Sequence, residues 1–292
     1  MANISVDRTA CIRCGACVDV CLAADVFALD EHGSKAVAPE RCWGCGQCIA
    51  ACPTDAIDHD AFPLEQCPII EASAMPSIDQ LVTAFRARRS HRMYSDKPVP
   101  RERIRELVSL GRWAPTASNN QALDWLAFDD PQRIRELSVA TVREIVRTVN
   151  FAKNPLTRPF VRLKAGKEMV RELRWASPLA EKMKAASDGG LDPVFYQAPV
   201  VLIGHSTASN NFGRDDAIYA GYNIMLAAEQ QGLGTVQIGF FQVVVEHSKR
   251  VLKLLGLPEG RAPQVAIALG YRKRSFRRLL PRRTPDLTWN PR

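Results

Sequence analysis

Apolar stretches along this chain are short, and charged stretches separate them. The longest, such as 198–204 and 224–228, have the length of a core strand or a core helix. No run of about 18 apolar residues occurs, so the sequence predicts no membrane span. Between 150 and 195, lysine, arginine and glutamate recur at helical spacing, which predicts an exposed insertion or lid over a globular core.

Start and stop signals define the predicted elements. Ser77, Pro100 and the Asp130–Pro131 pair are typical of helix starts, and Gly232 and Gly256 of helix ends. The predicted helices cover 77–89, 100–112, 130–149, 215–231 and 246–255, and the predicted strands cover 198–205, 235–238 and 264–269. Because the helices outnumber the strands and do not alternate with them strictly, we expect the α+β class.

Prolines concentrate between the first sixty residues and the helical signals. Pro63, Pro68 and Pro76 fall within 61–77, which is typical of a linker. We therefore expect a small domain at 1–62, a linker at 63–76 and a larger domain at 77–292.

Nine cysteines are too many for chance, and eight of them form two runs of equal spacing. The runs are Cys11-x2-Cys14-x2-Cys17-x3-Cys21 and Cys42-x2-Cys45-x2-Cys48-x3-Cys52-Pro53. Three cysteines two residues apart let one tight loop reach three corners of a [4Fe–4S] cubane, and the fourth corner must be reached from elsewhere. Zinc, which usually takes two Cys-x2-Cys knuckles, is the weaker alternative.

The two runs resemble those of bacterial two-cluster ferredoxins, in which the fourth cysteine of each run ligates the other cluster. This resemblance assigns one [4Fe–4S] cluster to Cys11, Cys14, Cys17 and Cys52. It assigns a second cluster to Cys42, Cys45, Cys48 and Cys21. Leu22 stands where the first run normally has proline. Cys67 lies outside both runs and is interpreted as a spare thiol in the linker.

Cysteine usage and charge narrow the function class further. A disulfide scaffold suits a short secreted chain, whereas residues 1–10 carry no apolar signal core, so we expect a cytoplasmic protein. Residues 1–70 carry ten acidic and four basic residues, and residues 272–292 carry eight basic residues and one acidic residue. An acidic front domain could therefore dock on a basic main domain, and the basic tail could bind an anion, with nucleic acid as the rival partner.

From residue 77 onward the sequence resembles the FMN-dependent nitroreductase family, in the form that carries an N-terminal ferredoxin domain. Four stretches carry the resemblance: Arg88-Arg89-Ser90-His91-Arg92 with Tyr94 and Asp96–Val99, then Arg112–Gln121, then Gly232–Phe240, and finally Leu269–Tyr271 with the basic tail around Pro281-Arg282-Arg283. The resemblance implies a three-layer α/β/α FMN domain after a bacterial-ferredoxin-like domain. It also implies a homodimer with FMN at the subunit interface.

The family pattern assigns roles to these stretches. A flavin mononucleotide phosphate is a dianion, for which guanidinium groups and a hydroxyl are suitable donors. The backbone N–H groups of Ile238 and Gly239 are expected to approach N5 and O4 of the flavin. The FMN-binding residues implied by the resemblance are Arg88, Arg89, Ser90, Arg92, Ser118, Asn119, Gln121, Gly234, Ile238, Gly239, Arg278 and Arg282.

The resemblance implies an oxidoreductase that passes electrons from the clusters to FMN and on to a small electrophile, such as a nitro, quinone or activated alkene group. No separate nicotinamide motif is evident, so the donor is either an external low-potential, ferredoxin-like protein or NAD(P)H. The alternative is an electron carrier or docking subunit whose second domain does not catalyse. A nucleic-acid-binding protein is disfavoured because no binding motif accompanies the basic tail. No catalytic side chain is evident, and Tyr196 and His205 are more consistent with structural roles than with proton donation.

Overall fold

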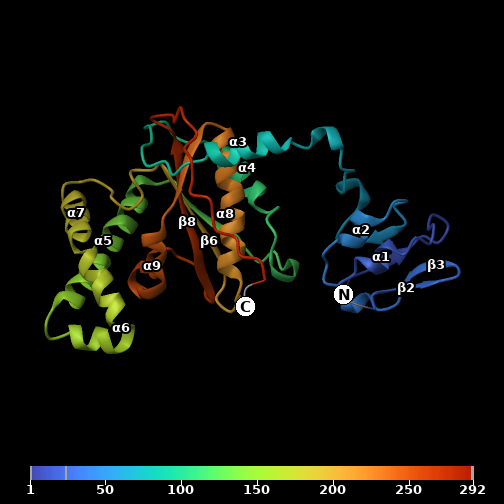
Figure 1. The fold of residues 1–292 in the computed structure, drawn as a ribbon, viewed down its shortest axis with the longest axis horizontal. Helices are drawn as coiled ribbons and strands as arrows, with labels where there is room; N and C mark the ends of the chain where they lie inside the picture. The colour runs from blue at the N-terminus through green and yellow to red at the C-terminus, as the bar shows by residue number, and fades with distance from the viewer. Residues whose placement is uncertain (1, 24, 291–292) are drawn as a thin grey trace. The chain divides into compact units, whose positions relative to one another are not determined.

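The computed structural model describes residues 2–23 and 25–290, and the chain forms two compact units (Figure 1). The first unit comprises the residues up to Ser77 together with Thr116–Asn120. The second comprises Ile78–Pro115 and the residues from Gln121 onward. The predicted linker 63–76 holds two short 3-10 turns, Leu64–Gln66 and Ala72–Ala74. The domain limits at 62 and 77 stay a prediction.

The first unit is built from short elements around the two cysteine runs. Its strands form two antiparallel pairs, β1 (Ile4–Val6) with β4 (Ile57–His59) and β2 (Phe27–Asp30) with β3 (Gly33–Ala36). Its helices are α1 (Ala16–Asp19), α2 (Gln47–Ala51) and the 3-10 turn Pro39–Arg41. Gly15 and Gly46 precede α1 and α2 in the left-handed conformation, at φ 76° and 71°, which favours glycine.

The core of the first unit is small, and two cysteines belong to it. Its buried residues are Ile4, Cys17, Val26, Phe27, Cys48, Ile49 and Ile57. A unit of this size buries little apolar surface, so this core alone stabilises it only marginally.

The second unit contains a four-stranded antiparallel sheet with the strand order β5-β6-β8-β7. The strands are β5 (Asp124–Phe128), β6 (Val200–Thr207), β7 (Leu233–Gln237) and β8 (Arg261–Tyr271). The helices are α3 (Ile78–Ala87), α4 (Arg101–Gly111), α5 (Pro131–Lys153), α6 (Arg158–Trp175), α7 (Ser177–Asp188), α8 (Gly213–Gln230), α9 (Gly239–His247) and α10 (Lys249–Leu254).

Both faces of this sheet are covered by helices. Successive residues of β6 alternate between two cores: Val200 and Leu202 pack with residues of α4 and α8, whereas Val201 and Ile203 pack with residues of α5 and α9. Figure 1 shows α8 running along the strands on one side. A strand buried on both faces is apolar without alternation, which is why the run at 198–204 predicted a core strand. The predicted three-layer α/β/α arrangement is confirmed.

The predicted elements of the second unit largely agree with the structure, with three differences. The predicted helix 246–255 is wrong in part, because the chain breaks at Ser248, whose hydroxyl accepts a hydrogen bond from the Val251 N–H at 3.4 Å and caps α10. The segment 150–195, predicted to be an exposed insertion or lid, is helical, and its helix α7 contains the buried residues Ala180 and Met183. Strand β5 was missed because its residues are only partly buried and it stands at the edge of the sheet. None of the described helices combines the length and apolar character needed to cross a bilayer.

Candidate cofactor sites

The first unit gathers cysteines of both runs around one cavity. Cys11, Cys14 and Cys17 line it together with Cys52, the last cysteine of the second run. This grouping is the one predicted for the first cluster, although the ligand sets themselves stay a prediction. Cys17 and Cys48 are buried, whereas Cys14 and Cys45 are exposed.

Backbone N–H groups point at several of these sulfurs. The N–H of Ser34 donates to Cys11 Sγ at 3.5 Å. The N–H of Gly44 donates to Cys42 Sγ at 3.3 Å, and that of Ala56 donates to Cys52 Sγ at 3.2 Å. Such donors stabilise metal-bound thiolates, so the loops fit a cluster carrying negative charge.

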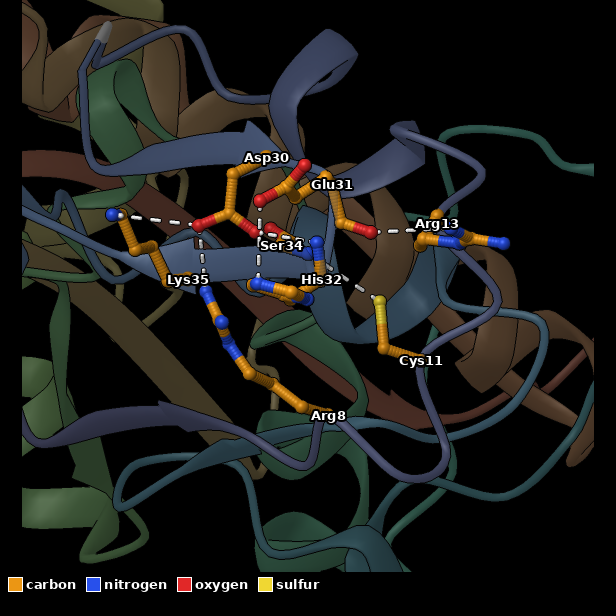
Figure 2. Close-up of polar contacts among 8 residues, drawn as sticks. All are labelled: Arg8, Cys11, Arg13, Asp30, Glu31, His32, Ser34 and Lys35. Carbon is orange, nitrogen blue, oxygen red and sulfur yellow. Dashed lines mark hydrogen bonds and ion pairs between the residues drawn. The ribbon is translucent and has the colours of Figure 1, made fainter.

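A polar network anchors the β2–β3 hairpin beside the first cysteine loop (Figure 2). Asp30 is its centre and contacts three groups: the side chain of Arg8 at 2.9 Å, the backbone N–H of His32 at 2.9 Å and Lys35 Nζ at 3.5 Å. The hydrogen bond from Arg8 and the one from His32 hold the pKa of Asp30 below its ordinary value. Arg13 Nη1 donates to the Glu31 carbonyl at 3.1 Å. Arg8 and Arg13 flank Cys11, so these bonds fix the hairpin against that loop.

The chemistry of the donor set also fits iron. Burial raises the pKa of the Cys48 thiol to about 11, so this sulfur is a thiol at neutral pH unless a positive charge displaces its proton. A coordinating metal supplies that charge and deprotonates the thiol. The eight thiols thus match the donor set that [4Fe–4S] clusters require.

In the second unit, the predicted anion-binding segment Arg88–Arg92 lies along the free edge of β7. Ser90 pairs with Thr235 as an isolated parallel bridge, and the His91 N–H donates to the Thr235 carbonyl at 3.0 Å. The approach is close: a Cβ added at Gly234 would lie 2.6 Å from the Cβ of His91, which excludes a side chain there. The fold therefore brings together two of the sequence stretches that predicted the flavin site.

Two buried polar atoms at this contact lack a hydrogen-bond partner among the described residues. They are Arg88 Nε and Thr235 Oγ1. Unsatisfied buried donors are rare in native structures, and a bound group with acceptor oxygens would satisfy both. The Arg88 guanidinium also lies over the Tyr222 ring, 5.7 Å from its centroid, which holds it in place. The segment thus fits the flavin phosphate or the polar edge of the ring.

A buried carboxylate braces this segment from behind. Glu229 Oε2 lies 3.2 Å from His91 Nε2, and Glu229 Oε1 pairs with Arg272. Arg272 Nε also donates to the Gly232 carbonyl at 3.3 Å. Burial lowers the pKa of His91, and the charge of Glu229 opposes that shift only in part. The ring of Phe276, at the start of the tail, packs 4.8 Å from the His91 ring.

Tyr196 and His205, the two residues considered as proton donors, each contact an arginine side chain. Arg92 lies over the Tyr196 ring, 5.6 Å from its centroid. His205 Nδ1 accepts a hydrogen bond from Arg261 Nε at 3.0 Å, and burial lowers the pKa of His205. These contacts favour the structural interpretation of both residues.

The loop before β5 holds three candidate residues in strained backbone. Ser118, Asn119 and Gln121 have φ angles of 51°, 51° and 45°. Non-glycine residues in the left-handed conformation cluster at functional sites, so the loop remains a candidate for flavin binding. Within the first unit, Asn119 Nδ2 donates to the Gly44 carbonyl at 2.6 Å.

The remaining candidates differ in how well they are placed. The Ile238 N–H already donates to the Ala266 carbonyl at 2.9 Å, whereas Gly239 is the exposed first residue of α9 and has open space around it. Arg89 is partly buried. Arg278 and Arg282 are exposed, in a tail that holds no helix or strand between Arg272 and Asn290. Their roles at the phosphate stay predictions.

Sequence reasoning missed Thr235, Glu229 and Arg272. Thr235 lies inside the stretch Gly232–Phe240 that was singled out for its glycines, and its neighbours could have drawn attention to it. Glu229 and Arg272 are distant in sequence and meet only because β7 and β8 are paired, so no local signal could have found them.

Comparison with known proteins adds two family matches. The sequence model described as "Nitroreductase family" matches residues 85–271, and the one described as "4Fe-4S dicluster domain" matches residues 10–56. A 4-nitrobenzoate reductase of Nocardioides sp. (strain LMS-CY) is 27% identical over 213 residues, which cover 68% of this chain and 83% of that protein. A ferredoxin of Thermococcus litoralis is 45% identical over 57 residues, which cover 19% of this chain and 93% of that protein.

Two solved structures share the fold. One is an FMN-bound nitroreductase of Bacteroides fragilis NCTC 9343, with a TM-score of 0.50, 20% identity and coverage of 71% of this chain and 95% of that one. The other is an iodotyrosine deiodinase bound to FMN and 3-iodo-L-tyrosine, with a TM-score of 0.51, 18% identity and coverage of 72% and 99%. At these identities the likeness shows the fold.

Proposed function

We propose that this member of the nitroreductase family, which carries a 4Fe-4S ferredoxin domain, reduces a small electrophile with electrons delivered through two clusters. The family and the ferredoxin domain make the chain an iron–sulfur, FMN-dependent oxidoreductase. The observation that carries the proposal is the presence, in one chain, of two complete four-cysteine runs and of Arg88, whose buried Nε atom has no hydrogen-bond partner among the described residues.

The cluster count rests on the cysteines. Cys11, Cys14, Cys17 and Cys52 line one cavity, which leaves Cys21 and the three cysteines of the second loop for another cluster. Each cubane takes four thiolates in ferredoxins of this type, so eight cysteines suit two clusters. Anaerobically prepared protein should then contain about eight iron and eight sulfide per chain, and a preparation with zinc and no sulfide would exclude the clusters.

The substrate class follows from the family and its relatives. The 4-nitrobenzoate reductase that matches 68% of the chain supports a nitro compound or another electrophile, such as a quinone or activated alkene. When bound, FMN supplies hydride or single electrons to such a group. Tyr196 and His205 each contact an arginine and are assigned structural roles, so solvent is proposed as the proton source.

The residues of the chain position the flavin. Arg88 and Arg92 carry the charge that a phosphate dianion needs, and Ser90 adds a hydroxyl beside them. Glu229, buried behind the segment, pairs with Arg272 and holds His91, so the binding edge is fixed before the flavin arrives. A fixed site loses little freedom on binding and therefore binds more tightly.

A homodimer is part of the proposal. Helix α3 has no buried residue in the isolated chain, yet Ile78, Leu81, Val82 and Phe85 form an apolar stripe at helical spacing. A second copy of the chain would cover this stripe. Replacing Leu81 and Phe85 by serine should shift the protein towards monomer in sedimentation experiments, whereas Arg86→Ser on the same helix should not. An unchanged dimer in the double variant would place the interface elsewhere.

Rapid-mixing spectroscopy tests the electron route. A low-potential donor is mixed with the full-length protein and with a full-length variant in which Cys14 and Cys45 are serine, both loaded with FMN. In the intact protein, bleaching of the clusters should precede flavin reduction. In the variant, FMN should stay bound but take electrons from that donor far more slowly. Equal rates would mean that the clusters do not deliver electrons and that NAD(P)H is the direct donor.

A further inference from the structure

The cluster unit holds two buried polar side chains whose hydrogen-bonding groups face a cysteine sulfur. Ser34 and His59 are each about 2% exposed, and neither belongs to the cysteine runs. Ser34 Oγ lies 3.0 Å from Cys17 Sγ, and His59 Nε2 lies 3.6 Å from Cys42 Sγ. In the ligand sets proposed above, Cys17 and Cys42 belong to different clusters, so each cluster has its own side-chain donor.

The direction of the first bond follows from the state of the sulfur. A free Cys17 thiol donates its proton to the Ser34 hydroxyl. A metal-bound thiolate has no proton, so the hydroxyl must turn and donate O–H to the sulfur. Ser34 also lines the cavity that Cys11, Cys14, Cys17 and Cys52 surround, and its N–H donates to Cys11 Sγ at 3.5 Å. It therefore contacts two of the four sulfurs of that group.

The hairpin holds Ser34 in this position. Ser34 is the second residue of β3 in the β2–β3 hairpin, whose turn is tied to the Cys11 loop by the network around Asp30 (Figure 2). A Cβ at Gly33 would lie 3.1 Å from Cys11 Sγ, so the turn already approaches the sulfur closely. These contacts hold the backbone of Ser34 beside the cysteine loop, with its hydroxyl 3.0 Å from Cys17 Sγ.

The tautomer of His59 follows from its second nitrogen. The Ala61 N–H donates to His59 Nδ1 at 3.1 Å, and a backbone N–H can only donate. Accepting this bond favours the tautomer with a lone pair on Nδ1 and the ring proton on Nε2, which faces Cys42. The Asp60 carboxylate also lies 3.1 Å from Nδ1. Backbone hydrogen bonds with Asn3 and Ala61, together with the charge of His59 and a hydrogen bond with His59, hold the pKa of Asp60 below its ordinary value. A proton on Nδ1 would be donated to this carboxylate instead.

The ring of His59 is held on its other side as well. It packs edge-on against Phe62 at 5.0 Å between centroids, and the imidazole is almost fully buried in the first unit. A buried donor with a fixed orientation has no water to bond to, so the sulfur is its available acceptor. Hydrogen bonds to cluster sulfurs stabilise the more negative, reduced state.

We propose that Ser34 and His59 are tuning residues for the two clusters: the Ser34 hydroxyl donates to the Cys17 thiolate, the His59 Nε2–H donates to the Cys42 thiolate, and each raises the reduction potential of its own cluster. The electron comes from the external low-potential donor, and its uptake makes or breaks no bond. The proposal rests on the two-cluster function above. One donor is a hydroxyl and the other is an imidazole, and each contacts a cysteine of a different proposed cluster. Replacing one residue at a time should therefore change the potential of one cluster at a time.

The test is a redox titration of the full-length protein followed by low-temperature EPR, in Ser34→Ala and His59→Leu. Each variant should make the one-electron reduction of one cluster about tenfold less favourable, a shift of about 59 mV to lower potential, and the two variants should shift different clusters. Ser34→Thr and His59→Gln, which keep a donor, should restore the potentials. His32→Leu, which removes an exposed histidine of the same unit, should shift neither cluster.

Potentials that stay unchanged in both variants, or that fall together for both clusters in each, would overturn the proposal. Iron and sulfide are counted in every sample, so a chain with one cluster would fail the count and refute the two-cluster function separately. If His59→Leu does not retain its clusters, unaltered protein labelled with 15N-histidine decides the question. Its reduced cluster should show a histidine nitrogen coupling that His59→Gln removes, and the absence of that coupling in the unaltered protein would refute the His59 bond.

Discussion

The two units of this chain are stabilised in different ways. In the second, a four-stranded sheet is buried on both faces, and two clusters of apolar residues separate it from its helices. In the first, the strands have three or four residues, and buried cysteines take the place of larger apolar side chains. Apolar burial supports one fold, and ligand bonds are needed to support the other.

This difference explains where each cofactor belongs. The cysteine unit organises its loops around sulfur atoms, so its cofactors are part of its core. In the sheet unit, the proposed flavin site lies at the edge of β7, where Gly234 allows the segment around His91 to approach. The clusters are therefore expected to be structural as well as redox groups, whereas the flavin is expected to be removable from a folded protein.

Removing the clusters is expected to have the largest effect, and to act on one unit only. Chelation of iron under reducing conditions should abolish amide protection in β1–β4, because metal-binding free energy is folding free energy in small metal domains. Protection in β6 and β8 should remain. Hydrogen exchange with mass spectrometry measures both regions in one sample. Cys67→Ser, which lies outside both runs, should leave the iron content and the exchange pattern unchanged.

Equal loss of protection in β6 and β8 on chelation would contradict the comparison. It would mean that the second unit also depends on the clusters, in spite of its two apolar cores.

The next effect concerns the flavin edge of the second unit. Arg88→Ala or Arg92→Ala should weaken FMN binding, because each removes a charge-assisted contact worth about 1.5–3 kcal/mol, or about 10–150-fold in Kd. Fluorescence titration of the apoprotein with FMN measures this. Arg86→Ala, an exposed arginine two residues before the segment, is the matched control and should keep the native Kd. A double variant that keeps full flavin occupancy would show that the site lies elsewhere.

These two predictions come from features that the sequence makes visible to different degrees. The cysteine runs reveal a cluster unit because ligand spacing is local. The three-layer order of the second unit follows from apolar runs, such as that of β6, which are also local. The brace of Glu229 on His91 and Arg272, and the contacts of Ser34 and His59 with cysteine sulfurs, join residues 17 or more positions apart, which no spacing rule reports.

Where the sequence prediction failed, the cause is physical. The helix expected at 246–255 breaks because Ser248 caps a new helix with its own hydroxyl, although serine also occurs inside helices. Strand β5 gives a weak signal because each of its residues is exposed or only partly buried. The sequence predicts an exposed, polar insertion at 150–195, but α7 buries Ala180 and Met183.

A smaller effect is expected from the close approach at β7. Gly234→Ala would place a Cβ 2.6 Å from the Cβ of His91 and 2.9 Å from Cγ of Arg272, and overpacking of this kind destabilises by about 1–3 kcal/mol. Gly239→Ala meets nothing within 4 Å at a backbone of ordinary φ, so it should leave the stability of the apoprotein nearly unchanged. Denaturant unfolding of both variants, monitored by tryptophan fluorescence, measures the difference. Equal midpoints would mean that the segment around His91 does not pack on β7.

The smallest effect is a pH dependence confined to the second unit. Burial lowers the pKa of His91 and of His205 in the folded chain. The folded chain therefore takes up these two protons at a lower pH than the unfolded chain, whose histidines have the ordinary pKa of about 6.5. Unfolding therefore takes up protons below about pH 6.5, and the free energy of unfolding falls as the pH falls through this window. Hydrogen exchange of the β6 and β8 amides in denaturant, measured at pH 7.5 and at pH 5.5, should show this loss of unfolding free energy. His205→Gln should reduce the loss, and His247→Gln, an exposed position, should not. A second unit equally stable at both pH values would mean that folding does not lower the pKa of the two imidazoles.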